Sequence, residues 1–78
     1  MIKAKYDKEA DAIYIYLSNK AYAYGKDLDE VRRIDYASDN TPIGIELLDV
    51  SKGININDLP DRKGISAYLS KHNICIYS

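Results

Sequence analysis

The segment 12–17, Ala-Ile-Tyr-Ile-Tyr-Leu, constrains the fold more than any other part of the chain. Its branched and aromatic residues alternate with a period of two, which is typical of a β-strand and not of a helix. One face of this strand would carry isoleucine and leucine, and the other face would carry Tyr14 and Tyr16. Because both faces are apolar or amphipathic, we expect a central strand that is at least partly covered on both sides.

Other segments alternate in the same way, and we expect further strands at 2–6, 31–36, 43–50 and 74–77. A short strand is also possible at 21–24, where Gly25 would end it. The connection 38–42, Ser-Asp-Asn-Thr-Pro, has the composition of a turn, because Asp and Asn side chains bond nearby backbone and proline fixes φ. The strands on either side of it should therefore pair as a hairpin.

One helix is expected at about 59–71, where a single apolar stripe is formed by Ile65, Tyr68, Leu69 and His72. Asp58 is the predicted N-cap, Asn73 suits the C-terminal stop, and a charged His72 would suit the helix dipole. The predicted fold class is α+β, a small antiparallel sheet of order β-β-β-β-α-β with the helix packed on its Ile/Leu face. We expect a single domain, 1–78, with the sheet in 1–53 and the helix and last strand in 54–78.

Composition narrows the function classes. A chain of 78 residues has little room for a deep cofactor cleft, so no cofactor is expected. The net charge of -1 disfavours a nucleic-acid partner, which would call for a basic excess. No apolar run is long enough to cross a membrane, and the first residues have no apolar signal region. The single cysteine, Cys75, is expected to be a small buried hydrophobic residue, and the predicted location is the cytoplasm.

No motif for phosphate binding, zinc binding or nucleophilic catalysis is present, so no catalytic residue is predicted. The acidic residues are the one candidate constellation, and they are Asp7, Glu9, Asp11, Asp35 and Glu46. The first three are spaced like calcium-loop ligands, but Ala12 and Ser18 stand where such a loop requires Gly and Glu. Two interpretations stay open: carboxylates that cap turns and pair with basic side chains, or a metal or acid–base site.

The eight tyrosines, in a chain without Phe or Trp, are the second candidate feature. Their hydroxyl groups suit half-buried sheet faces and interfaces better than a dry core. The residues expected at an interface are Tyr14, Tyr16, Tyr22 and Tyr24. The alternative is that these rings only cover the second face of the sheet.

Two stretches resemble a known family: 6–15, Tyr-Asp-Lys-Glu-Ala-Asp-Ala-Ile-Tyr-Ile, and 44–51, Gly-Ile-Glu-Leu-Leu-Asp-Val-Ser, with Asp35 before the turn. Together they are similar to the domain of unknown function 2283, and the resemblance extends over about 1–53. It implies a small prokaryotic protein whose acidic residues belong to a recurring pattern. Some members lie beside small toxin-like genes, which implies an antitoxin-like binding role, and no catalytic residues are carried over.

The leading hypothesis is a non-enzymatic protein-interaction module that forms a homodimer, binds a small protein partner, or does both. The alternative is a small metal-assisted hydrolase or nuclease that uses Asp7, Asp11, Asp35 and Glu46.

Overall fold

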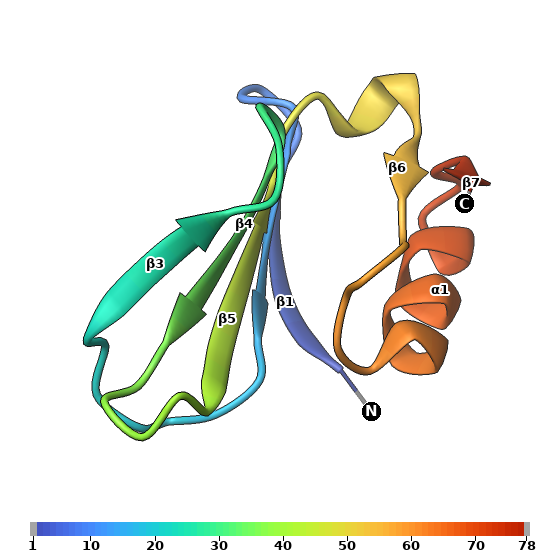
Figure 1. The fold of residues 1–78 in the computed structure, drawn as a ribbon. Helices are drawn as coiled ribbons and strands as arrows, with labels where there is room; N and C mark the ends of the chain where they lie inside the picture. The colour runs from blue at the N-terminus through green and yellow to red at the C-terminus, as the bar shows by residue number, and fades with distance from the viewer. Residues whose placement is uncertain (1, 78) are drawn as a thin grey trace.

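Five short strands pair into one antiparallel sheet, which forms the larger layer of the protein (Figure 1). The computed structural model describes residues 2–77. The strands are β1 (Lys3–Asp7), β2 (Ala12–Tyr16), β3 (Tyr24–Asp27), β4 (Arg32–Tyr36) and β5 (Pro42–Leu47), and their order across the sheet is β1-β2-β5-β4-β3. With one helix packed against this sheet, the α+β class predicted from the sequence is confirmed.

The pairing of β4 with β5 confirms the hairpin predicted across residues 38–42, with Ile34 opposite Ile45. The middle strand of the five is β5. The segment 12–17, which was expected to be central, forms β2, between the edge strand β1 and β5. The expectation that 12–17 would be at least partly covered on both sides holds in part. Ile13 and Ile15 are buried on one face, and on the other face Tyr14 is half-buried whereas Tyr16 is 44% exposed. Strand β3 also runs through Gly25, which was expected to end a strand at 21–24.

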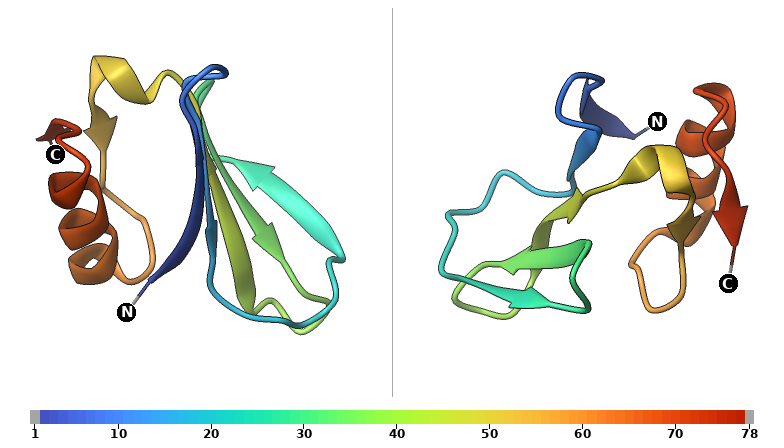
Figure 2. Two further views of the ribbon diagram at one scale, coloured as in Figure 1. Left: turned by 180° about the vertical axis from the view of Figure 1, so that it is seen from behind. Right: turned by 90° about the horizontal axis from the view of Figure 1, so that it is seen from above.

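The second layer consists of residues 50–77, here called the C-terminal unit, and it covers one face of the sheet (Figures 1 and 2). It contains a 3-10 helix η1 (Val50–Lys52), β6 (Ile54–Asn55), the helix α1 (Arg62–Lys71) and β7 (Ile76–Tyr77). The last strand is shorter than the predicted 74–77, and it pairs in parallel with β6 and not with the main sheet. None of the helices in the described part of the chain is long and apolar enough to cross a membrane.

Cys75 is exposed, so its predicted burial is wrong. The two neighbouring isoleucines, Ile74 and Ile76, turn toward the core, and the alternation of an extended segment then directs Cys75 outward. The Cys75 carbonyl accepts a hydrogen bond of 2.9 Å from the backbone N–H of Ile54, so this residue contributes through its backbone.

The helix begins later than the sequence predicted. Its N-cap is Asp61, at φ 52° and without a side-chain cap bond, and the predicted cap Asp58 lies in a preceding turn at φ 65°. Leu59, between them, is only 5% exposed. The turn directs this leucine into the core before the helix starts, and burial of one leucine outweighs the roughly 1 kcal/mol of a side-chain cap.

The end of the helix agrees with the prediction. Asn73 adopts a left-handed conformation at φ 61°, and its N–H donates to the Ser70 carbonyl at 3.1 Å. The N–H of Ile74 donates to the Leu69 carbonyl at 2.9 Å, and both of these side chains belong to the core. These two bonds and the apolar contact form a Schellman motif, which satisfies the last carbonyls of the helix. His72 is the C-cap residue, as its predicted place at the helix end required.

The core lies between the two layers. The face of the sheet that points toward the C-terminal unit, here called the inner face, contributes Ile13, Ile15, Ile34, Ile45 and Leu47. The C-terminal unit contributes Val50, Ile54, Leu59, Ile65, Leu69 and Ile74. Each fully buried aliphatic side chain stabilises the fold by about 1.5–3 kcal/mol relative to an exposed one, so the two layers depend on each other for stability.

One charged residue lies within this contact. Arg32 is on the inner face of β4 and is 7% exposed. Its Nη1 donates to the carbonyls of Asn55 at 2.9 Å and Asn57 at 2.7 Å, and its Nε donates to Asp29 Oδ2 at 2.8 Å. Burial opposes ionisation of Asp29, but the bonds from Arg32 prevail and lower the pKa of that carboxyl. Arg32 thus joins the sheet to the turn that precedes the helix.

We predict that Arg32→Met lowers the free energy of unfolding by about 2–4 kcal/mol, because two carbonyls and one carboxylate lose their donor. Urea unfolding followed by circular dichroism measures this change. Arg33→Met is the matched control, because Arg33 is the next residue but points to the opposite, solvent-facing side. Equal losses in the two variants would contradict the role given to Arg32.

Candidate functional site

The second face of the sheet, here called the outer face, is not covered by any other element of residues 2–77 (Figure 2). The pairing registers align its residues in two rows that cross all five strands. The first row consists of Lys5, Tyr14, Glu46, Arg33 and Asp27, and the second consists of Lys3, Tyr16, Gly44, Asp35 and Gly25. A row of this kind places charges and aromatic rings about 5 Å apart.

A chain of polar contacts runs through the middle of the outer face. The hydroxyl of Tyr14 donates to Asp35 Oδ2 at 2.8 Å. The other carboxylate oxygen of Asp35 lies 3.4 Å from Arg33 Nε, and Arg33 Nη1 donates to Asp27 Oδ1 at 3.0 Å. The side chain of Asp35 is only 16% exposed, so its contacts with Tyr14 and Arg33 are the least screened on this face.

Gly44 makes the contact between Tyr14 and Asp35 possible. It lies between Tyr16 and Asp35 in the second row, and the ring of Tyr14 lies directly over it. A Cβ atom at position 44 would be 1.9 Å from the Tyr14 hydroxyl oxygen. Only glycine therefore allows the tyrosine to reach across β5 to the carboxylate on β4.

The environment of Tyr14 changes its acidity. Burial, followed by the hydrogen bond to Asp35 and the charge of that carboxylate, raises the pKa of Tyr14 well above its ordinary value. The phenol therefore stays protonated at neutral pH and acts as a fixed donor to Asp35. The ring also contacts Tyr16 in an edge-to-face arrangement, with the centroids 5.0 Å apart.

The four tyrosines expected at an interface do not all lie together. Tyr14 and Tyr16 are on the outer face, and Tyr22, 58% exposed, precedes β3. The Tyr22 side chain and Asp27 together hold the pKa of Arg33 above its ordinary value. Tyr24 is on the opposite side, because it pairs with Tyr36, with ring centroids 5.1 Å apart, and donates to Asn40.

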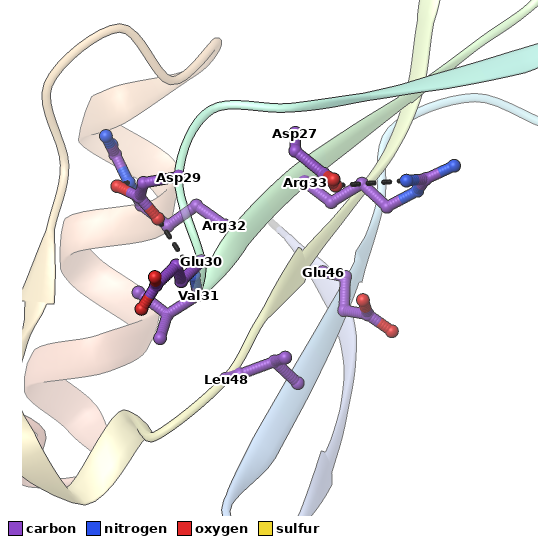
Figure 3. Close-up of a pocket in the computed structure, with 8 residues that line it drawn as sticks. All are labelled: Asp27, Asp29, Glu30, Val31, Arg32, Arg33, Glu46 and Leu48. Carbon is purple, nitrogen blue, oxygen red and sulfur yellow. Dashed lines mark hydrogen bonds and ion pairs between the residues drawn. The ribbon is translucent and has the colours of Figure 1, made fainter.

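A shallow depression of about 350 Å³ borders the outer face where β4 begins (Figure 3). Its charged lining consists of four carboxylates and two guanidinium groups, from Asp27, Asp29, Glu30, Glu46, Arg32 and Arg33. Val31 and Leu48 form its apolar part, and Leu48 is 37% exposed. Figure 3 shows Arg33 and Glu46 pointing away from the helix, whereas Arg32 and Asp29 point toward it. We call this feature the acidic depression.

The remaining acidic residues stabilise the hairpin that joins β1 to β2. Asp7 Oδ1 accepts a hydrogen bond from the Ala10 N–H at 3.0 Å, which closes the turn. Asp11, at φ 56°, accepts from the backbone N–H of Ser51 at 2.9 Å and from its hydroxyl at 2.7 Å. The carboxylate of Asp11 therefore holds the 3-10 helix that leads into the C-terminal unit. Glu9 is exposed in the turn.

The structure thus divides the predicted acidic set between two places. Asp7, Glu9 and Asp11 belong to the hairpin, while Asp35 and Glu46 lie on the outer face. Within residues 2–77, no three Asp, Glu, His or Cys side chains form a group that could hold a metal ion. Asp7 and Asp11 have the turn-capping role that was one of the two interpretations of the sequence.

The sequence reasoning missed two parts of this site. The contact between Tyr14 and Asp35 has a signal only in the register, where Gly44 leaves an open position beside Asp35 in the second row and Tyr14 lies one row away. The acidic depression has a signal in the sequence, the run Asp27-Leu28-Asp29-Glu30, but this run lies in the part of the chain where no strand was assigned.

We predict that Asp11→Ala destabilises the protein by about 1–2 kcal/mol, because the 3-10 helix loses its acceptor and alanine disfavours the left-handed backbone. Asp11→Asn should retain most of the stability, because asparagine tolerates this conformation and keeps an acceptor oxygen. Glu9→Ala, in the same turn, is the control and should have almost no effect. Thermal and urea unfolding measure all three; a large effect of Glu9→Ala would contradict this assignment.

Alkaline titration tests the contact between Tyr14 and Asp35. Because the pKa of Tyr14 is higher in the folded than in the unfolded chain, the protonated phenol stabilises the folded state at pH values below the ordinary tyrosine pKa of about 10. This stabilisation is lost as the pH rises above that value. Tyrosinate absorbance should therefore include a step well above that value, and this step should disappear in Tyr14→Phe. Gly44→Ala should move it to lower pH, whereas Gly25→Ala, whose Cβ would meet only the flexible guanidinium of Arg33, should not. An unchanged titration in Gly44→Ala would contradict the geometry.

Comparison with known proteins identifies the family of the sheet. The family model described as "Protein of unknown function (DUF2283)" matches residues 3–51. No curated protein and no solved structure matches the chain. The matched region begins with β1 and ends at Ser51, the residue that Asp11 holds, so it contains the whole five-stranded sheet. On this match over more than half of its length, the chain belongs to the DUF2283 family.

Proposed function

We propose that this protein is a protein-interaction module whose binding surface is the outer face of the sheet. The observation that carries the proposal is that the chain covers one face with its own C-terminal unit and leaves the other face open. This open face has exposed aromatic and apolar side chains, including Tyr16 and Leu48. Exposed tyrosines beside a polar rim are typical of protein-binding surfaces.

The fixed geometry of the outer face supports the same proposal. Tyr14 is held by Asp35, and Arg33 is held between Asp35 and Asp27, so these side chains lose little conformational entropy when a partner binds. Side chains that are already ordered reduce the cost of association by about 0.5–1.5 kcal/mol each. A surface that lacked such contacts would have to order its long side chains during binding.

The charges of the site indicate what a partner must present. In the acidic depression, Asp29 and Asp27 are already paired with Arg32 and Arg33. Glu30 and Glu46, beside Val31 and Leu48, are left to complement a lysine or arginine with an aliphatic stem. An antitoxin-like role is the form of this proposal in which the partner is a small basic protein. A hydrolase that uses Asp7, Asp11, Asp35 and Glu46 has no comparable support, because these carboxylates lie in two separate places.

Site-specific photo-crosslinking in the native host tests the proposal. A photoreactive residue replaces Tyr16 on the outer face in one variant and Tyr77 on the C-terminal unit in the other. Both positions are well exposed, at 44% and 56%, so solvent access does not distinguish them. We expect one abundant protein adduct from position 16 and a much weaker one from position 77. Equal adducts from both positions, or adducts from position 77 alone, would contradict a binding surface on the outer face.

A further inference from the structure

We propose that the outer face binds the outer face of a second copy of this chain, so that two sheets pack against each other about a twofold axis parallel to β5. This proposal rests on the proposed function and names its partner. Strand β5 is the middle strand of the five, so an axis along it superimposes the two faces over their full width. Two sheets packed in this way form an aligned sandwich.

The order of charges across the outer face favours this arrangement. Rotation about β5 exchanges the two edges of the sheet and keeps the level along the strands. The first row runs Lys5, Tyr14, Glu46, Arg33, Asp27 from β1 to β3. Lys5 of each copy therefore meets Asp27 of the other. This contact occurs twice because the interface is isologous.

The twofold axis passes over Gly44, the middle residue of the second row. The ring of Tyr14 lies over this glycine, so the Tyr14 rings of the two copies meet at the axis. Tyr16 of each copy meets Asp35 of the other, whose two carboxylate oxygens already contact Tyr14 and Arg33 of its own chain. Glu46, in the first row, is the one residue that approaches its own copy with the same charge. This repulsion limits the affinity and provides a diagnostic substitution.

The size of the face predicts a weak dimer. Five strands at a spacing of about 4.8 Å and five residues at about 3.3 Å each give a face of roughly 24 Å by 17 Å. Two such faces bury roughly 800–1,000 Å² together with their flanking loops, at the low end of specific interfaces. We therefore expect dissociation in the micromolar range.

Charge reversal in the purified full-length chain tests the proposal. Lys5→Asp and Asp27→Lys should each weaken the dimer about tenfold, because each replaces two attractions with two repulsions. A mixture of the two variants should form a heterodimer as tight as the original, because both of its pairs are again of opposite charge. The double variant should dimerise for the same reason. Glu46→Gln should tighten the dimer. Sedimentation velocity over a concentration series measures all of these species.

Matched controls carry the same charge changes elsewhere. Lys63→Asp on α1 and Glu9→Lys in the first turn should leave the dissociation constant unchanged, and circular dichroism confirms that each variant is folded. A wild-type chain that stays monomeric at about 1 mM would overturn the proposal, and so would the failure of the mixture to recover. If the chain is monomeric while position 16 still crosslinks a different protein in cells, the second copy is wrong but the binding surface remains.

Discussion

The contact on which the structure depends most is the buried guanidinium of Arg32. The family sheet ends at Ser51, and nearly all of its cover comes from the residues that follow. Hydrophobic contact between the two layers is strong but not directional, so it would allow the C-terminal unit to slide. Arg32 donates to two carbonyls and one carboxylate, and these bonds require the turn at Asn55 and Asn57 to lie in one place. A buried charge thus supplies the register that the apolar contact lacks.

The outer face shows how a small sheet acquires a defined surface without a second layer. Tyr14 lies across Gly44 to reach Asp35, and Arg33 connects Asp35 to Asp27. Side chains from three of the five strands therefore form one chain of contacts on this face, and this chain passes over β5. The glycine is essential because the contact passes directly above its backbone. An acidic pattern that the sequence presented as one set has two separate roles in the structure, one in the hairpin and one on the sheet.

The sequence predicted what depends on local chemistry. Alternation identified four of the five strands of the sheet, the turn at 38–42 identified the hairpin of β4 and β5, and Asn73 marked the end of the helix. Prediction from the sequence failed where a contact between residues far apart in the chain determines the local structure. Gly25 could not be interpreted without the side chain of Arg33 above it, and the start of the helix could not be placed without the burial of Leu59. Tyr14 and Asp35 are 21 positions apart, and only the register brings them together.

The closed inner face has a consequence for the size of any assembly. A chain made of residues 3–51 alone would have two open faces, and sheets of that kind can stack without limit, as layers do in a fibril. The C-terminal unit occupies one of these faces within the same chain. Exposed lysines on β1 discourage pairing along that edge. One open face then remains for growth, and once a single copy occupies it, stacking terminates at a finite particle.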